Sequence, residues 1–500
     1  MTTPATSPPL LPAQGLPEDE LFARLETFRE HDLATRGGRT WAYVYDTGRA
    51  EIDRIAERAY VAFLHENGLD PTVFPSLLGL ENEVVAIALA HLGGGPDGVG
   101  SFTSGGTESC MLAIKAARDQ ARSRRTIGRG NLVLPCTAHA AFHKAARYFD
   151  LDTRVVDVDP VTFKADVDAV AAAIDDDTVA IVGSAPSYAH GVLDPIEALG
   201  RLALERDVWL HVDACVGGWL LPYLRRLGRE VAPFDLSVPG VTSLSVDLHK
   251  YAYCPKGASL VLYRDREARR HQLFACADWT GYTVINPTIQ SSKTGGAIAA
   301  AWATLHHVGD DGYLDIARRT QDATQQLVAG IDAIDGLEVL GAPEMTMVAA
   351  QAEGFDVFEV IDLMKDRRWY VQPQLSYGPS PANVHFSVTA TSLEVVAPML
   401  EDLADCVAIA RETPADPGRD GLLAALRDLD PAAFTPEMYG QMLAMAGLGG
   451  GAQLPERMAE INAIMDALPP ALKEQLLVAF LNDLFVPARP APDGAPSDDA

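Results

Sequence analysis

The chain has 500 residues, of which 48% are hydrophobic, and it carries a formal net charge of -28. This length is too great for one small domain and is ample for a large buried core. The strongly negative charge argues against nucleic acid or an anionic membrane surface as a partner.

The first hundred residues, 1–100, are expected to form an N-terminal segment of their own. A Pro-rich stretch through residue 16 is predicted to be disordered. Apolar residues then recur at helical spacing and predict three helices, at residues 17–35, 50–67 and 77–92.

From residue 101 to 264, short β-rich runs alternate with helical stretches. This alternation predicts βαβ units and a mostly parallel sheet with helices on both faces, within a large domain spanning 101–296. The clearest strand candidates are residues 131–135, 179–184, 208–212, 244–246 and 259–262.

The remainder of the chain is predicted to hold three further parts. A linking helix is expected within 297–335, followed by a small α+β domain at 336–412. In that domain we expect strands at 337–340 and 384–388 and helices at 357–367 and 393–410. A helical extension with a disordered tail fills 413–500, with amphipathic helices at 458–468 and 471–485. We interpret it as a packing or dimer-interface appendage.

Features that would indicate secretion, a membrane or a metal are missing from the sequence. The start of the chain lacks the basic and apolar regions of a signal peptide, and no apolar run reaches the roughly 18 residues of a membrane helix. The six cysteines form no C-x-x-C pair and show no zinc-like spacing with histidine. We therefore expect a cytoplasmic protein with buried reduced thiols, no metal site and no membrane contact.

Chemically distinctive residues stand just beyond the predicted strands, at the edge where α/β sheets bind ligands. The turn 103–108 contains Gly105 and Gly106 and precedes a helix predicted at 109–122, so its free N–H groups could hold a phosphate. Taken alone, such a turn is more often only a helix cap. Asp213 ends the run 208–212 and could cap a helix, or it could keep a pyridine nitrogen protonated.

Two further residues follow predicted strands. Lys250, beside His249 and close to Asp247, comes after the run 244–246. Burial near other cations lowers the pKa of a lysine and makes it an amine nucleophile, although a surface lysine is the simpler interpretation. His139 follows the run 131–135 and is either a structural residue or one that stacks on a planar ring. The order of turn, histidine, aspartate and lysine is that of enzymes that use pyridoxal 5′-phosphate (PLP) on the aminotransferase-like fold.

The sequence resembles the PLP-dependent group II decarboxylases, and within them the sphingosine-1-phosphate lyase branch. The likeness runs from about Trp41 to Arg411, roughly three quarters of the chain. The stretches that carry it are TSGGTES at 103, HAAFHKAARYF at 139, IVGSAPSYAHGVLDPIEALG at 181, HVDACVGGWLLPYL at 211 and SVDLHKYAYCPKGASLVLY at 245. The resemblance implies the PLP-dependent transferase fold type I, with a seven-stranded, mostly parallel sheet, and a homodimer whose active sites are shared.

It also implies roles for individual residues. Lys250 would carry PLP as a Schiff base, Asp213 would pair with the pyridine nitrogen, and His139 would stack on the ring. The cofactor phosphate would be held by Gly105, Gly106, Thr107 and His249. Ser292, in the segment 291–296, would reach in from the partner chain.

A small-molecule amino substrate would be held by a further set of residues, namely Tyr45, Asn67, Asp70, Tyr188, Lys256 and Lys293. Two of these depart from the family pattern. Lys293 stands where the family typically has arginine and loses the bidentate fork of a guanidinium. Asp70 stands where the family has histidine, which removes a donor from the edge of the site.

The bond that is broken is not decided by the cofactor residues, because retro-aldol cleavage and decarboxylation need the same electron sink. No arginine occurs from Trp369 through Ala410, where aminotransferases of this fold usually clamp a carboxylate. We therefore predict a carbon–carbon lyase acting on a 2-amino-3-hydroxy compound, phosphorylated or not, with Tyr188 or Lys256 assisting removal of the hydroxyl proton. The alternatives are an amino-acid decarboxylase and a non-catalytic scaffold.

Overall fold

The computed structural model describes residues 11–12, 14–413, 417–427, 429 and 457–487. The chain forms two compact units, one of residues 35–413 and one that combines residues 1–34 with 414–500. The boundaries expected near residues 100, 296 and 335 all fall inside the larger unit, so the finer division into five segments stays a prediction.

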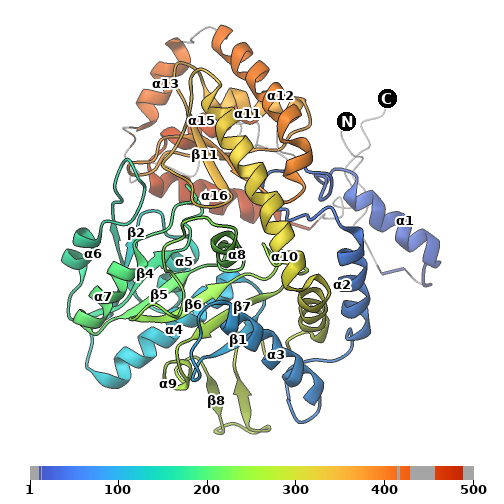
Figure 1. Cartoon of the computed structure of the whole chain (residues 1–500), viewed down its shortest axis with the longest axis vertical. Coiled ribbons are helices and arrows are strands. Elements are labelled where there is room, and N and C mark those ends of the chain that lie inside the picture. The colour runs from blue at the N-terminus through green and yellow to red at the C-terminus, as the bar shows by residue number, and fades with distance from the viewer. Residues whose placement is uncertain (1–10, 13, 414–416, 428, 430–456, 488–500) are drawn as a thin grey trace, which may run out of the picture. The chain divides into compact units, whose positions relative to one another are not determined.

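A seven-stranded sheet forms the centre of the larger unit (Figure 1). Its strand order is β1-β7-β6-β5-β4-β2-β3. Neighbouring strands from β3 through β6 pair in parallel, whereas β7 runs antiparallel to both β1 and β6. The predicted mostly parallel sheet is confirmed. The strands are β1 (Val99–Thr103), β2 (Asn131–Pro135), β3 (Asp152–Val156), β4 (Thr178–Ser184), β5 (Trp209–Asp213), β6 (Val241–Val246) and β7 (Ser259–Tyr263).

Helices accompany the strands in the alternating order that the sequence predicts. Those that precede or follow the strands of this sheet are α2 (Ala50–Ala62), α3 (Pro75–His91), α4 (Gly106–Arg124), α5 (Ala141–Tyr148), α6 (Val167–Ala173), α7 (Ile196–Arg206), α8 (Leu221–Arg226) and α9 (Arg266–Arg269). A separate hairpin pairs β8 (Phe274–Cys276) with β9 (Val284–Asn286).

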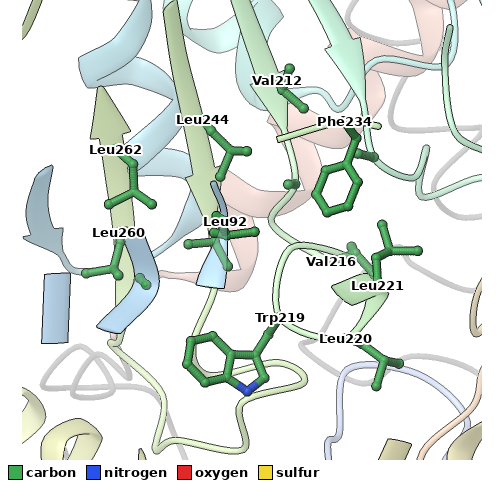
Figure 2. Close-up of a cluster of buried hydrophobic side chains, with 14 of the residues drawn as sticks. Leu92, Val212, Val216, Trp219, Leu220, Leu221, Phe234, Leu244, Leu260 and Leu262 are labelled. Carbon is green, nitrogen blue, oxygen red and sulfur yellow. The ribbon is translucent and has the colours of Figure 1, made fainter. Parts of the chain in front are cut away.

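Alternate residues of the central strands point to opposite faces of the sheet, as the pleat requires. One face is apolar: Val212, Leu244, Leu260 and Leu262 pack there with Trp219 and other side chains in one buried cluster (Figure 2). The opposite face, which packs against α4, is more polar on β5 and β6. Trp209, His211 and Asp213 alternate on β5, and Ser243 and Ser245 alternate on β6. All five are buried.

The last part of the larger unit contains a four-stranded antiparallel sheet of order β10-β11-β13-β12. Its elements are β10 (Leu337–Val339), β11 (Met347–Ala352), α11 (Val357–Asp366), β12 (Gln372–Gln374), β13 (Asn383–Ser387) and α12 (Ser392–Glu412). The preceding helix, α10 (Gly295–Asp332), is not continuous as expected. Gly309 interrupts it with φ 63° and ψ 174°, a conformation that glycine adopts without steric cost.

The segment before α2 is joined to this smaller sheet by backbone hydrogen bonds. Trp41 donates its N–H to Tyr370 O at 2.8 Å, and Ser387 donates to Trp41 O at 2.7 Å. The Trp41 side chain is 1% exposed. Residues near 41 therefore belong physically to the sheet that contains β12 and β13.

The other unit contains four described helices: α1 (Glu18–Arg29), α13 (Pro417–Arg427), α15 (Ala459–Ala467) and α16 (Pro470–Leu484). Leu426, Leu468, Leu472 and Leu476 pack together in its small core. The helices predicted at 458–468 and 471–485 are confirmed, while α1 is shorter than the predicted 17–35. The segments expected to be disordered fall mostly outside the described residues. In the part of the chain that the structure describes, no helix combines the length and apolarity needed to cross a bilayer.

Candidate active site

A cavity of about 450 Å³ opens where β4, β5 and β6 end. Ser184 and Asp213 are the last residues of β4 and β5, and Asp247 directly follows β6. The residues that line the cavity are Ser104, Gly105, Gly106, Thr107, Glu108, Cys110, His139, Ser184, Pro186, Tyr188, Asp213, Cys215, Val216, Asp247, His249 and Lys250. The structure thus brings together all the residues predicted to bind the cofactor except Ser292.

The N-terminus of α4 forms one wall of the cavity. The helix begins at Gly106, and no side chain caps its first N–H groups. A Cβ atom at Gly106 would lie 2.6 Å from Asp247 Oδ2 and 2.9 Å from Cys215 Sγ, so only glycine fits there. Uncapped N–H groups and the positive end of the helix dipole favour an anion such as a phosphate.

Lys250 and Asp247 form an ion pair on the floor of the cavity, with Nζ 2.9 Å from Asp247 Oδ2. Burial alone would lower the pKa of Lys250, but the Asp247 carboxylate, acting together with Tyr45, Cys215 and Asp213, outweighs burial and raises it well above its usual value. The expectation of a lowered lysine pKa is therefore wrong for the free side chain, because the sequence does not reveal how close this carboxylate lies. Burial opposes ionisation of Asp247 too, yet Lys250 and His249 keep its pKa below the usual value.

Three hydrogen-bonded side chains surround this pair. His249 shares a hydrogen bond of 2.8 Å between its Nδ1 and Ala258 O. His139 accepts from Ala141 N through Nδ1 at 3.1 Å, which fixes the orientation of its ring. Tyr188 donates its hydroxyl proton to Gln372 Oε1 at 2.6 Å, and burial raises the pKa of this phenol.

Asp213 is the carboxylate at the end of β5 and is 8% exposed. Its Oδ1 accepts hydrogen bonds from Cys215 N at 3.0 Å and from Ser245 Oγ at 3.3 Å. No hydrogen bond to Oδ2 is found among the described residues, so this oxygen remains able to accept one from a ligand in the cavity.

Two predicted substrate residues lie near Lys250 without lining the cavity. The Lys256 Nζ atom is 4.8 Å from the centre of the Tyr45 ring and 3.2 Å from Tyr43 O. The Lys256 side chain is exposed in the single chain, but partial desolvation by neighbouring residues, followed by the charge of Lys250, lowers its pKa. Burial raises the pKa of Tyr45. The two residues are therefore electrostatically coupled to Lys250.

The remaining predicted residues do not line this cavity. Asn67 Oδ1 accepts from Leu69 N, and exposed Asp70 accepts from the backbone and hydroxyl of Thr72. Ser292 is exposed. Lys293 lines a second cavity of about 400 Å³, where its Nζ lies 2.6 Å from Glu81 Oε2. Within one chain, Asn67 and Asp70 therefore lie outside the cavity. Ser292 and Lys293 are expected to reach the site from the partner chain, so their role stays a prediction.

The structure also reveals two site cysteines that the sequence did not indicate. Cys110 and Cys215 place potential ligand atoms within 4.8 Å of each other and of Asp213, the spacing that a shared metal ion requires. The sequence predicted no metal because Cys110 is far along the chain from the other two. The environment of both thiols raises their pKa values, so both favour the protonated form that binds metals poorly. Gln372, which contacts Tyr188, was also missed because it lies on the smaller sheet.

These features fit PLP when tested against its chemical groups. The uncapped start of α4 suits the phosphate, the primary amine of Lys250 suits the aldehyde, and the free Oδ2 of Asp213 suits the pyridine nitrogen. Asp247 Oδ1 is buried without a hydrogen-bond partner among the described residues. An unsatisfied carboxylate oxygen of this kind is typical of functional sites rather than of a finished core.

Comparisons with known proteins agree with this assignment. Residues 51–353 match the pyridoxal-dependent decarboxylase conserved domain, and residues 420–483 match a C-terminal putative HTH domain of pyridoxal-dependent enzymes. The chain is 40% identical over 411 residues to sphingosine-1-phosphate lyase from Oryza sativa subsp. japonica, a match that covers 81% of this chain and 75% of the relative.

Solved structures give the same result. Sphingosine-1-phosphate lyase from Burkholderia pseudomallei superposes with a TM-score of 0.77 at 38% identity, covering 80% of this chain and 93% of that one. Glutamate decarboxylase from Lactobacillus brevis superposes with a TM-score of 0.72 at 20% identity, over 82% of this chain and 97% of that one. The second match shows the fold alone.

Fold and cavity together define a PLP-dependent enzyme of fold type I, and both the predicted cofactor and the predicted lyase class are confirmed. The chain belongs to the pyridoxal-dependent decarboxylase family, in its sphingosine-1-phosphate lyase branch.

Proposed function

We propose that this lyase cleaves the Cα–Cβ bond of a phosphorylated 2-amino-3-hydroxy compound of the sphingosine 1-phosphate class. Cleavage converts C3 and its hydroxyl into an aldehyde and leaves C1 and C2 as 2-aminoethyl phosphate. The curated relatives are named for this substrate, and the chain spans three quarters of the length of the first of them.

One observation within the structure carries this choice over decarboxylation. The side of the cavity at Tyr188 is closed by neutral groups: Tyr188 bonds Gln372, and Gln372 Nε2 donates to Tyr43 OH at 2.9 Å. Among the described residues, no arginine lines the cavity. A substrate carboxylate would find no bidentate cationic partner on this wall, whereas a hydroxyl group would find hydrogen-bonding partners.

The cofactor, when bound, withdraws electrons from Cα and makes either cleavage possible. In the role we propose, Lys250 attaches it, Asp213 holds its ring nitrogen, His139 lies against its ring, and the start of α4 with His249 holds its phosphate. Thr107 contributes to the same wall through the first turn of α4.

Lys256 is the residue to which we assign acceptance of the hydroxyl proton. Tyr188 is the other candidate, but burial raises its pKa, so the phenol keeps its proton and serves as a hydrogen-bond partner. Partial desolvation and the charge of Lys250 lower the pKa of Lys256, which makes the neutral amine easier to reach. Tyr45, whose phenol also stays protonated, is the proposed donor to the substrate phosphate.

We further propose a cytoplasmic homodimer with shared active sites. The segment 291–296 would approach the cavity of the partner chain, as the resemblance implies. Ser292 suits this role because it is exposed, whereas the ammonium group of Lys293 is already paired with Glu81. Asn67 and Asp70 belong to the same proposed surface.

Product analysis tests the proposed reaction. The PLP-loaded enzyme would be incubated separately with sphingosine 1-phosphate, a short-chain phosphorylated 2-amino-1,3-diol, the unphosphorylated diol and a panel of L-amino acids. Aldehyde and 2-aminoethyl phosphate in equal amounts are expected from the phosphorylated compounds, with none from the Lys250→Ala variant. Release of CO₂ from an amino acid without any aldehyde would establish the decarboxylase instead.

A further inference from the structure

A continuous row of hydrogen bonds lies behind Asp213, between β5 and β6. The parallel register sets His211 beside Ser243 and Asp213 beside Ser245. Trp209 Nε1 donates to Ser243 Oγ at 2.7 Å, and Ser243 Oγ lies 2.8 Å from His211 Nδ1. We call the row of Trp209, Ser243, His211 and Ser245 the β5–β6 chain.

The row continues to the carboxylate. His211 Nε2 lies 3.3 Å from Ser245 Oγ, and Ser245 donates to Asp213 Oδ1 at 3.3 Å. His211, Ser243 and Ser245 are each 0% exposed, so water does not compete for these bonds. The β5–β6 chain is therefore a buried connection that starts at an indole and ends at the proposed partner of the cofactor ring.

Hydrogen-bond chemistry fixes the direction of this connection. The indole N–H of Trp209 can only donate, so Ser243 accepts from it and has one proton to give. If Ser243 gives that proton to His211 Nδ1, the imidazole carries its own proton on Nε2 and donates it to Ser245. Ser245 then donates to Asp213, and every group in the chain is satisfied.

The opposite direction leaves groups unsatisfied. His211 would donate from Nδ1 to Ser243, which would then receive two protons and hold a third for which no acceptor is found in the described structure. Ser245 would donate to His211 instead of Asp213. A doubly protonated imidazole is disfavoured as well, because burial lowers the pKa of His211 to about 4.

We propose that the β5–β6 chain positions Asp213 for the ring nitrogen of PLP. Ser245 accepts from His211 and also from the Cys215 thiol at 3.3 Å. Its own proton is directed at Asp213 Oδ1, because a carboxylate is a much stronger acceptor than the Cys110 sulfur 3.6 Å away. With the Cys215 N–H, this bond holds Oδ1 and turns Oδ2 towards the cavity. His211, Ser243 and Ser245 are thus positioning residues that act through Asp213, and the inference rests on the role proposed above for that carboxylate.

A cofactor analogue isolates this role from ordinary stability. 1-Deazapyridoxal 5′-phosphate keeps the aldehyde, hydroxyl and phosphate of PLP but has carbon in place of the ring nitrogen. Binding of PLP and of the analogue to apoenzyme would be measured by absorbance titration for wild type, Ser245→Ala and Ser109→Ala. Ser109 is the matched control, since it is a buried serine on α4 that hydrogen-bonds to Thr103 and Ser259 and takes no part in the β5–β6 chain.

Loss of the Ser245 donor should weaken PLP about tenfold, the usual effect of one hydrogen bond to a charged group, and should leave the analogue unaffected. Ser109→Ala should change both affinities equally. Equal weakening of PLP and the analogue by Ser245→Ala would overturn the proposal, because it would indicate a structural role only.

Two variants of His211 provide a second, independent test of the proposal. His211→Gln can keep a donor near Ser245 and should retain more PLP selectivity than His211→Leu, which removes it. In wild-type enzyme labelled with ¹⁵N-histidine, the His211 signal, identified by its loss in His211→Gln, should show a protonated Nε2 and a bare Nδ1. A protonated Nδ1 would refute the proposed direction of hydrogen-bond donation along the β5–β6 chain.

Asp213, the residue at which the β5–β6 chain ends, is tested separately by the Asp213→Ala variant. This variant should abolish the preference for PLP over the analogue. If Asp213→Ala keeps this preference, the proposed role of Asp213 is wrong. If Asp213→Ala loses the preference but Ser245→Ala keeps it, only the proposed role of the β5–β6 chain is wrong.

Discussion

Breaking the ion pair between Lys293 and Glu81 should reduce stability rather than substrate affinity. The Lys293 side chain is 6% exposed and that of Glu81 17%, and their nearest charged atoms are 2.6 Å apart. Glu81 Oε1 also accepts from Phe102 N at 2.9 Å, so the carboxylate is held in place even without its cation. Lys293→Met would leave this largely covered carboxylate without its cation.

The expected magnitude follows from that burial. Removing one partner of a buried pair typically costs about 3 kcal/mol of unfolding free energy, whereas an exposed pair contributes less than about 1 kcal/mol. The double variant Lys293→Met/Glu81→Gln removes both charges and should recover on the order of 2 kcal/mol of the loss. Met fills much of the volume of the lysine stem, so the change tests charge rather than packing.

Urea unfolding followed by circular dichroism would measure the four members of this cycle, and steady-state kinetics would be recorded on the same PLP-loaded samples. We expect lower unfolding midpoints for the single variants, partial recovery in the double variant and a KM close to that of wild type. A KM raised tenfold or more with an unchanged unfolding midpoint would refute the reasoning and return Lys293 to the substrate site.

Four other changes test the rest of the site. Lys250→Ala should lose all activity and all cofactor that borohydride can fix to the protein, whereas retention of fixed cofactor would contradict the assignment of this lysine. Gly106→Ala should weaken PLP binding at least tenfold, since its Cβ would meet Asp247 at 2.6 Å, and unchanged affinity in an absorbance titration would show that α4 can shift. If Lys256 accepts the proton, kcat should rise as the pH passes through the lowered pKa of Lys256. Lys256→Arg keeps the charge but cannot act as a base near neutral pH, so this variant should remove the rise. An unchanged pH profile in the variant would argue that Lys256 contributes only its charge. Burial raises the pKa of Asp194 to about 6, so the folded state holds the carboxyl proton more tightly than the unfolded state does. The stability of wild type relative to Asp194→Asn should therefore fall as pH rises from about 4 to about 6. A difference in stability that does not change with pH would contradict this burial effect.

Local sequence patterns predicted the elements that carry strong periodicity. The strand at 131–135 was placed correctly, because five apolar or extended residues are bounded by turn residues on both sides. β3 was missed because its residues are largely exposed at the edge of the sheet, so it shows no buried run. The break in α10 was missed because a single glycine inside a helical pattern does not by itself reveal its backbone angles.

Some residues of the candidate site could likewise be predicted from the sequence, whereas others could not. Asp213 ends β5, and His139 and Lys250 follow β2 and β6 within four residues. The topology of a parallel sheet brings such residues together whatever their separation in sequence. The pairing of Lys293 with Glu81 and of Tyr188 with Gln372 depends on the packing of distant segments, which no local pattern encodes. The direction of the Lys250 pKa shift was misjudged for the same reason, since it depends on how close Asp247 and the other surrounding groups lie to the ammonium group.

The backbone bonds between Trp41 and the smaller sheet bear on how this protein can be shortened. The conserved domain of the family begins at residue 51, yet Trp41, Tyr43 and Tyr45 precede it and contribute to the sheet and to the surroundings of Lys256. A gene trimmed to the family boundary would remove a fully covered indole and uncover Phe386, which packs edge-on against it at 5.9 Å. Aggregation of such a trimmed protein would then reflect a lost structural strand partner rather than any defect in the catalytic domain itself.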